Sequence, residues 1–138
     1  MKKRMLRTIC LFLIFGLLLS TASAASQVQP RYQKIHTITA ELLSISLAGR
    51  ATCYGLANSL DTSCRLDLYV DLQQSEDGVN GWTTIKTWTT SGYGDVVIED
   101  FWYVDSGYYY RAVTSVIVYN SQGAYIESDA TDSAVFYY

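Results

Sequence analysis

Proline and histidine are nearly absent from this 138-residue chain, which contains one proline, Pro30, and one histidine, His36. Because proline cannot donate a hydrogen bond to a β-ladder, every segment after Pro30 remains able to form a strand. A Ser-His-Asp or Cys-His catalytic device would have to use His36. That residue lies beside a polar lead-in segment, and we expect it to face solvent at the start of the first strand. The sequence therefore predicts no catalytic residue.

Long apolar runs are limited to a single one near the N-terminus. Basic residues within positions 1–7 precede an apolar stretch at residues 9–19, and a segment of small residues follows it and ends at Ala24. This order is typical of a secretory signal peptide that is cleaved after Ala24. The apolar stretch is too short to span a bilayer, which needs about 20 apolar residues. We therefore expect a secreted, extracellular product, free or associated with the cell surface, with no membrane insertion after signal removal.

Cysteine is scarce, and because Cys10 falls within the expected signal peptide, only Cys53 and Cys64 remain. A structural zinc site needs about four ligands, and only His36 could join these two cysteines, so we expect no metal and no cofactor. Two cysteines in a small exported domain are typical of one disulfide. The sequence thus predicts a bridge between Cys53 and Cys64, with two buried free thiols as the alternative.

Basic residues are outnumbered, with 10 Lys and Arg against 13 Asp and Glu. The expected signal peptide contains four of the basic residues and none of the acidic ones, so the formal charge falls from −3 for the whole chain to −7 for residues 25–138. An acidic surface repels phosphate groups. We therefore expect no nucleic acid and no anionic lipid among the partners.

Helical periodicity is also missing, whereas threonine, β-branched and aromatic residues, which suit strands, are abundant. A change in apolar parity at Leu42 and Leu43 indicates a bulge or a switch between sheets. We expect the last of the candidate strands to be broken within residues 129–132. Seven runs lie between turn signals, at residues 36–47, 50–57, 64–74, 82–90, 95–104, 108–119 and 124–136.

The run at residues 64–74 alternates most clearly, and its apolar members Leu66, Leu68, Val70 and Leu72 share one side. This pattern is typical of a strand with one face in the core and one in water. Seven short strands indicate an all-β fold, a two-sheet antiparallel sandwich, with a small closed barrel as the alternative. The expected organisation is a signal peptide at 1–24, a polar linker at 25–35 and the sandwich domain at 36–138.

Residues 104–113 resemble the corner between strands E and F of fibronectin type III and related immunoglobulin-like domains. Val104 stands where strand E ends in those families, a glycine-containing turn follows, and Tyr110 begins the next strand. The resemblance implies an immunoglobulin-like sandwich in which the Tyr110 hydroxyl bonds the backbone of the preceding turn, the tyrosine corner. Tyr108 has the same parity and is the competing candidate.

Most of residues 42–138 also resemble a family of small secreted proteins from Gram-positive bacteria that have no assigned function. The resembling pieces are Leu72-Gln73 before a glycine-containing turn, Trp82 and Trp88 around the next strand, residues 107–111, and a late pair formed by Gly123 and Glu127. This resemblance implies the fold and no activity. The disulfide of antibody domains is not carried over, since the two cysteines fall on the second and third runs.

Aromatic residues, including three tryptophans and twelve tyrosines, offer the main indication of function. Rigid amphipathic rings on a β-face can stack on sugar rings or anchor a protein partner, although cross-strand packing alone is the alternative. Strand parity predicts that Trp102 and Tyr110 point inward, and that Trp82 and Trp88 share one side. The residues predicted to contact a ligand are Tyr69, Trp82, Trp88, Tyr109 and Tyr119.

Acidic residues offer weaker indications of chemistry. Asp67 and Asp71 share a strand face, and a glycosidase needs two facing carboxylates, but a solvated acidic face is the preferred interpretation. Glu76, Asp77 and Asn80 could bind calcium or simply form a turn. We therefore expect a non-enzymatic extracellular recognition module that binds a glycan or a protein through a sheet face. The alternatives are a structural or assembly protein of the cell envelope or spore surface and, less favoured, a small secreted hydrolase; the sequence leaves the oligomeric state open.

Overall fold

The computed structural model describes residues 33–138, so the predicted signal peptide, its cleavage point at Ala24 and residues 25–32 of the predicted linker lie outside the described residues. No helix in the described part of the chain is long and apolar enough to cross a membrane. The all-β prediction is confirmed. The strands are β1 (Ile35–Ile45), β2 (Arg50–Ser59), β3 (Arg65–Ser75), β4 (Thr83–Tyr93), β5 (Asp95–Tyr103), β6 (Tyr109–Tyr119), β7 (Tyr125–Asp132) and β8 (Phe136–Tyr137).

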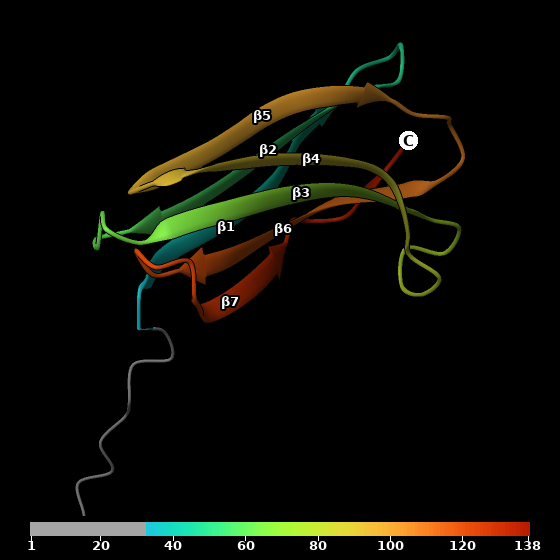
Figure 1. Ribbon diagram of the computed structural model, residues 1–138. Helices are drawn as coiled ribbons and strands as arrows, with labels where there is room; N and C mark the ends of the chain where they lie inside the picture. The colour runs from blue at the N-terminus through green and yellow to red at the C-terminus, as the bar shows by residue number, and fades with distance from the viewer. Residues whose placement is uncertain (1–32) are drawn as a thin grey trace, which may run out of the picture. The chain divides into compact units, whose positions relative to one another are not determined.

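Two antiparallel sheets form the domain (Figure 1). The smaller sheet has the order β1-β2-β5, and the larger has the order β4-β3-β6-β7, with β8 pairing the start of β6. The chain passes from β4 in the larger sheet to β5 in the smaller one through the single residue Gly94, whose φ of 74° suits glycine. The predicted pair of antiparallel sheets is confirmed, and the sheets remain separate layers instead of closing into a barrel.

The core lies between the two sheets and follows the period-two pattern of the sequence. Leu66, Leu68, Val70 and Leu72 of β3 are all fully buried, as predicted. Ala112, Thr114, Val116 and Val118 continue the same face on the neighbouring strand β6, also without exposure. Burying one Leu or Val side chain stabilises a fold by about 1.5–3 kcal/mol before entropy is counted. The β3–β6 pair therefore forms the centre of the core.

Small residues line the inner side of β2, which faces that pair. Ala51, Cys53, Gly55 and Ala57 alternate along the strand and are all buried. A Cβ atom at Gly55 would lie 2.3 Å from Cγ2 of Val70, so no side chain fits there. The close approach of the sheets at this point is therefore possible only because β2 carries a glycine.

The first strand contains the irregularity that the sequence indicates. Leu42 pairs with Cys53, whereas Ser44 pairs with Thr52, so the register shifts between Leu42 and Ser44. Leu42 is buried while Leu43 is exposed. The parity change is thus a β-bulge within one sheet and not a switch between sheets.

The last strand is interrupted later than predicted. Its pairing with β6 continues through residues 129–132, and the break falls at residues 133–135. Ser133 explains this position, because its hydroxyl oxygen accepts a hydrogen bond from the Ala112 amide at 2.9 Å. The Ser133 side chain thus accepts the hydrogen bond of a β6 amide at the point where β7 stops pairing with β6.

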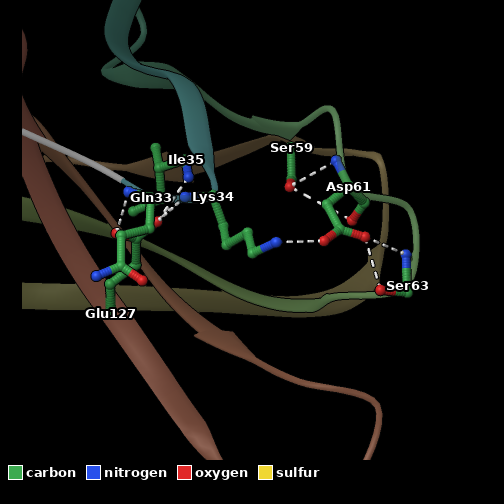
Figure 2. A network of polar contacts seen from close by, with 7 residues as sticks. All are labelled: Gln33, Lys34, Ile35, Ser59, Asp61, Ser63 and Glu127. Atoms are coloured by element: carbon green, nitrogen blue, oxygen red, sulfur yellow. Dashed lines mark hydrogen bonds and ion pairs between the residues drawn. The ribbon is translucent and has the colours of Figure 1, made fainter. Parts of the chain in front are cut away.

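A network of polar contacts fixes the beginning of the domain (Figure 2). The Glu127 carboxylate on β7 accepts hydrogen bonds from the backbone amides of Gln33, Lys34 and Ile35 at 2.8, 2.6 and 2.7 Å. The Lys34 ammonium lies 2.5 Å from the Asp61 carboxylate, and this hydrogen bond, followed by those from Ser63, holds the pKa of Asp61 well below its usual value. Residues 33–35, assigned to the linker by the sequence, are therefore docked on the domain.

We expect Glu127→Ala to lower the free energy of unfolding by about 2 kcal/mol, because three backbone donors lose a charged acceptor. Urea denaturation monitored by tryptophan fluorescence measures the change. Asp129→Ala is the matched control. Asp129 lies on the same strand, and its carboxylate makes no hydrogen bond within residues 33–138. Equal destabilisation by the two variants would contradict the proposed role of Glu127.

The hydrogen bond expected of Tyr110 is present. Tyr110 is fully buried, and its hydroxyl donates to the Asp105 carbonyl, five residues earlier, at 2.6 Å. Burial, followed by the nearby Asp105 charge, raises the pKa of the Tyr110 hydroxyl. The contact fastens the turn that leads from the smaller sheet into β6 in the larger one.

Tyr110→Phe is expected to reduce the free energy of unfolding by about 1 kcal/mol, which is the net contribution of one such hydrogen bond. Chemical denaturation of both proteins tests this value. Tyr108→Phe serves as the comparison, because Tyr108 is only half-buried and engages the chain through its backbone amide and carbonyl. A larger loss of stability from Tyr108→Phe than from Tyr110→Phe would show that the assignment of the corner contact to Tyr110 is wrong.

Candidate functional site

The outer surface of the larger sheet carries the main group of predicted ligand contacts. Tyr69 lies at its centre on β3, half-buried, and pairs with Thr89 on β4 and Ser115 on β6. Along the strand, Asp67 and Asp71 precede and follow it on the same face. An aromatic ring is thus surrounded by hydroxyl groups and carboxylates. We call this surface, from the β3 residue Arg65 to the β3 residue Gln73, the outer β3 face.

At one end of the outer β3 face, Tyr119 packs beside a cation. The Arg65 guanidinium lies 4.7 Å from the centre of the Tyr119 ring, and its Nε is 3.1 Å from the Asp67 carboxylate. Arg65 also pairs with Tyr93 on β4, and Tyr119 pairs with Tyr125 on β7. Tyr93 and Tyr125 are both exposed. These two tyrosines were not predicted from the sequence, because only strand pairing brings them beside Arg65 and Tyr119.

At the other end, Trp82 is held in a similar way. The Arg111 guanidinium lies 4.3 Å from the Trp82 ring centre, and Arg111 also donates hydrogen bonds to Gln73 at 2.9 Å and to Asp132 at 3.0 Å. The indole N–H of Trp82 donates to the Val79 carbonyl at 3.2 Å. The Arg111 cation thus covers the Trp82 ring, and the hydrogen bond to Val79 fixes the edge of the ring. Trp82 is therefore positioned before any ligand arrives.

Tyr109 lies at this same end of the larger sheet, where β6 begins. Its ring is 4.9 Å from the Tyr137 ring, tilted by 56°, and it approaches Gly78 so closely that a Cβ there would be 2.8 Å from the ring. Tyr109 thus braces the loop between β3 and β4. Four of the five predicted contacts, Tyr69, Trp82, Tyr109 and Tyr119, belong to the larger sheet or to the loop at its end.

Trp88 lies on the opposite side of the sheet from Trp82, so the predicted shared side is wrong. Trp88 pairs with the buried residue Val70 and packs against the core. The register of β4 shifts at Ile85, because Leu72 pairs with Lys86 while Gln73 pairs with Thr84. This bulge reverses the parity between the two tryptophans. Trp88 therefore cannot contribute to a ligand site on the outer β3 face.

Trp102 is 44% exposed, although its parity predicts a buried ring. Its pairing partner Ala51 is buried, so the Trp102 side chain projects from the inner side of β5, as parity predicts. However, β5 is an edge strand of the smaller sheet. The group that faces Trp102 from the larger sheet is the Lys86 ammonium, 4.6 Å from the Trp102 ring centre. Trp102 is not buried as expected because the Lys86 cation, and not an apolar side chain, covers its ring at this end of β5.

The predicted disulfide is wrong, since Cys53 and Cys64 are both buried free thiols. Gly55, two residues after Cys53, packs on Val70, which lies six residues after Cys64 along β3. At about 3.3 Å per residue, Cys64 lies about 20 Å from the Gly55–Val70 contact, and Cys53 lies only two residues from that contact. A disulfide needs Cα atoms closer than about 7 Å. Burial, and then the Asp100 charge, raises the pKa of Cys53 to about 12. Burial also raises the pKa of Cys64.

Asp67 and Asp71 lie farther apart than the two carboxylates of a glycosidase. Asp67 and Asp71 are four residues apart along β3, about 13 Å, which exceeds the carboxylate separations of about 5–9.5 Å found in glycosidases. Within residues 33–138 no three His, Cys, Asp or Glu side chains gather as metal ligands. His36 is exposed at the start of β1, as expected.

The loop between β3 and β4 is held in shape by Asp77. The Asp77 carboxylate accepts hydrogen bonds from the backbone amides of Asn80 and Val79, at 2.7 and 2.8 Å, and these lower the pKa of Asp77 to about 2. An open pocket of about 510 Å³ lies beside this loop, between Ser75 and Tyr108. Asp77 therefore acts as a turn former, which is the simpler of the two interpretations offered by the sequence.

Comparisons of this chain with protein-family models, with curated protein sequences and with solved structures find no match. Function must therefore be inferred from the side chains that this chain itself presents.

Proposed function

We propose that this chain is a secreted, non-enzymatic recognition module of the fibronectin type III-like kind that binds a neutral glycan through the outer β3 face. The single observation that carries the proposal is the arrangement of Tyr69, Tyr119 and Trp82 on one surface, with hydroxyl groups and carboxylates between the rings. Aromatic faces stack on the apolar faces of sugars, and the intervening polar groups bind their hydroxyls.

The strand order supports the fibronectin type III-like assignment. In immunoglobulin constant-type domains strands A, B and E share one sheet and C, F and G share the other. Here β1, β2 and β5 occupy the first three places and β3, β6 and β7 the second three. The fourth strand, β4, lies beside β3 and not beside β5. The Tyr110–Asp105 hydrogen bond adds the corner that the sequence resemblance implied.

The dimensions of the face support an extended ligand. Tyr69 is four residues from Arg65 and four from Gln73 along β3, so the aromatic groups at the two ends lie about 13 Å on either side of the central ring. No strand among the described residues covers this side of the larger sheet. Separate, non-adjacent sugar units of a linear glycan could therefore contact the three rings along the strand direction.

The charge of the domain supports a neutral ligand over an anionic one. Residues 33–138 contain five basic and thirteen acidic side chains, a formal charge of −8. Arg65 and Arg111, the basic residues beside the ligand-facing rings, are already bound to Asp67 and Asp132. Charged groups are depleted at the centre of protein interfaces, whereas Asp67 and Asp71 flank the central Tyr69. These features favour a hydroxyl-rich ligand over a protein.

We expect Tyr69→Ala to weaken glycan binding at least tenfold, about 1.4 kcal/mol, which is the usual loss when a central aromatic contact is removed. The measurement uses an array of neutral and amino-sugar oligosaccharides, followed by titration of the best ligand. Tyr54→Ala is the matched control: Tyr54 is also half-buried on a central strand, and its neighbours on the outer side of the smaller sheet are Glu41 and Glu99.

Two results would overturn this proposal. Absence of binding to every oligosaccharide on the array would remove its basis, and equal losses for Tyr69→Ala and Tyr54→Ala would place the ligand elsewhere. Incubation of the best ligand with the protein, followed by a reducing-end assay, separates recognition from the hydrolase alternative, because recognition leaves the chain length unchanged.

A further inference from the structure

Each sheet of the domain has two edge strands, and three of these four edges are irregular. The pairing of β1 shifts register twice, that of β4 shifts opposite Leu72 and Gln73, and that of β7 shifts at Val118 before the strand stops at the break. Bulges and interruptions of this kind prevent another strand from pairing along an edge. These three edges are therefore protected by their own geometry.

The fourth edge, β5, is regular over its whole length. Its nine residues pair one by one with β2 without a register shift, and within the described residues no strand pairs with its other side. Its exposed side chains are unusually apolar for an edge: Val97 is 47%, Phe101 39%, Trp102 44% and Tyr103 63% exposed. A long, flat edge with apolar side chains is the usual template for an added strand.

The charge on β5 decides which kind of strand it can accept. Asp95, Glu99 and Asp100 are exposed, and the strand contains no basic residue. A second copy pairing antiparallel over the full strand would place Glu99 opposite Glu99 of the other copy, and like charges across strands are destabilising. Asp100 also accepts a hydrogen bond from the Phe101 amide at 2.7 Å, which covers one backbone donor when nothing is bound. The edge therefore opposes self-pairing and attracts positive charge.

We propose that the open edge of β5 accepts an extended, lysine- or arginine-bearing segment of another protein as an additional strand of the smaller sheet. Basic side chains of that segment pair with Asp95 and Glu99 on the outer side of the sheet, and a carbonyl of the segment replaces the Asp100 carboxylate at the Phe101 amide. The apolar side chains at the alternate positions pack against Trp102 on the inner side. This surface is separate from the outer β3 face, so it does not depend on glycan binding.

The test uses a labelled nine-residue peptide of alternating lysine and valine, mixed with the full chain as it is produced after secretion. Fluorescence anisotropy measures the affinity, and hydrogen–deuterium exchange locates the binding site. We expect binding that slows amide exchange in residues 97–103 and leaves the larger sheet unchanged. The same peptide with every amide N-methylated, and a glutamate–valine peptide, are each expected to bind at least tenfold more weakly.

A charge-removing variant carries the second arm of the test. Asp95→Asn, Glu99→Gln and Asp100→Asn together are expected to weaken lysine–valine binding at least tenfold, whereas Asp129→Asn on the larger sheet leaves it unchanged. Thermal unfolding of both variants checks that they fold. Slowed exchange in another strand, or equal affinity for the N-methylated peptide, would overturn the proposal. So would a dimer of the protein alone that protects β5, since the occupant would then be a second copy.

Discussion

Gly55→Val is expected to lower the free energy of unfolding by about 3 kcal/mol or more, the upper part of the range for overpacked cores. A Cβ at this position would lie 2.3 Å from Cγ2 of Val70 and 2.7 Å from the hydroxyl oxygen of Thr114, both of them on fully buried residues. Those side chains cannot move into solvent, because the β3–β6 pair fills the centre of the core. The two sheets must separate locally to admit the valine. Urea denaturation, or loss of soluble protein, reports the effect.

A double-mutant cycle distinguishes this clash from a general intolerance of β2 to substitution. Gly55→Ala and Val70→Ala each destabilise alone, the first by overpacking and the second by leaving a cavity. Together they should cost less than their sum, since Val70→Ala removes the Cγ2 atom that the new methyl group meets. Strict additivity would show that the Gly55–Val70 contact is not the cause.

Stability is expected to fall as the pH rises above about 9, and Cys53 is expected to be a major cause. Burial, followed by the Asp100 charge, raises the pKa of Cys53 from 9.0 to about 12 in the folded protein. The unfolded chain therefore releases the thiol proton first, and stability that is fully present below pH 9 is lost between pH 9 and 12. The loss approaches about 1.4 kcal/mol for each pH unit in this window.

Cys53→Ala provides the comparison for this prediction, because alanine fits the site and does not titrate. Urea denaturation at pH 8, 9 and 10 should give a smaller loss for this variant than for the unchanged protein. Measurements at or below pH 10 limit the contribution of Tyr110, whose pKa is raised above 10. Identical losses in the two proteins would show that Cys53 does not control the alkaline transition.

Strand positions were predictable where one face is buried along the whole strand. Leu66, Leu68, Val70 and Leu72 alternate without interruption, and because the side-chain period of a strand is two, the core face follows directly. The bulge after Leu42 was also visible, since a bulge in a half-buried strand changes the parity of its apolar residues. These features depend only on neighbours in sequence.

Features set by contacts between distant strands were not predictable. The bulge at Ile85 leaves no parity signal, because β4 has no buried residue on either side, and so Trp82 and Trp88 were assigned to one face. The disulfide prediction relied on the expected compartment, whereas the packing of β2 on β3 keeps the two cysteines far apart. Likewise, the outward position of Tyr119 followed from strand parity, but the cations beside Tyr119 and Trp82, Arg65 and Arg111, come from strands that only the fold brings together.

The Glu127 carboxylate has a consequence for how the domain resists mechanical tension. A pull on the residues that precede Gln33 reaches β7 through this carboxylate, because three consecutive amides at the start of β1 are bound to it. Since β7 belongs to the other sheet, the force is divided between both layers from the beginning of extension. The hydrogen bonds between β1 and β2 can break one at a time only after the three amide bonds to the Glu127 carboxylate have broken.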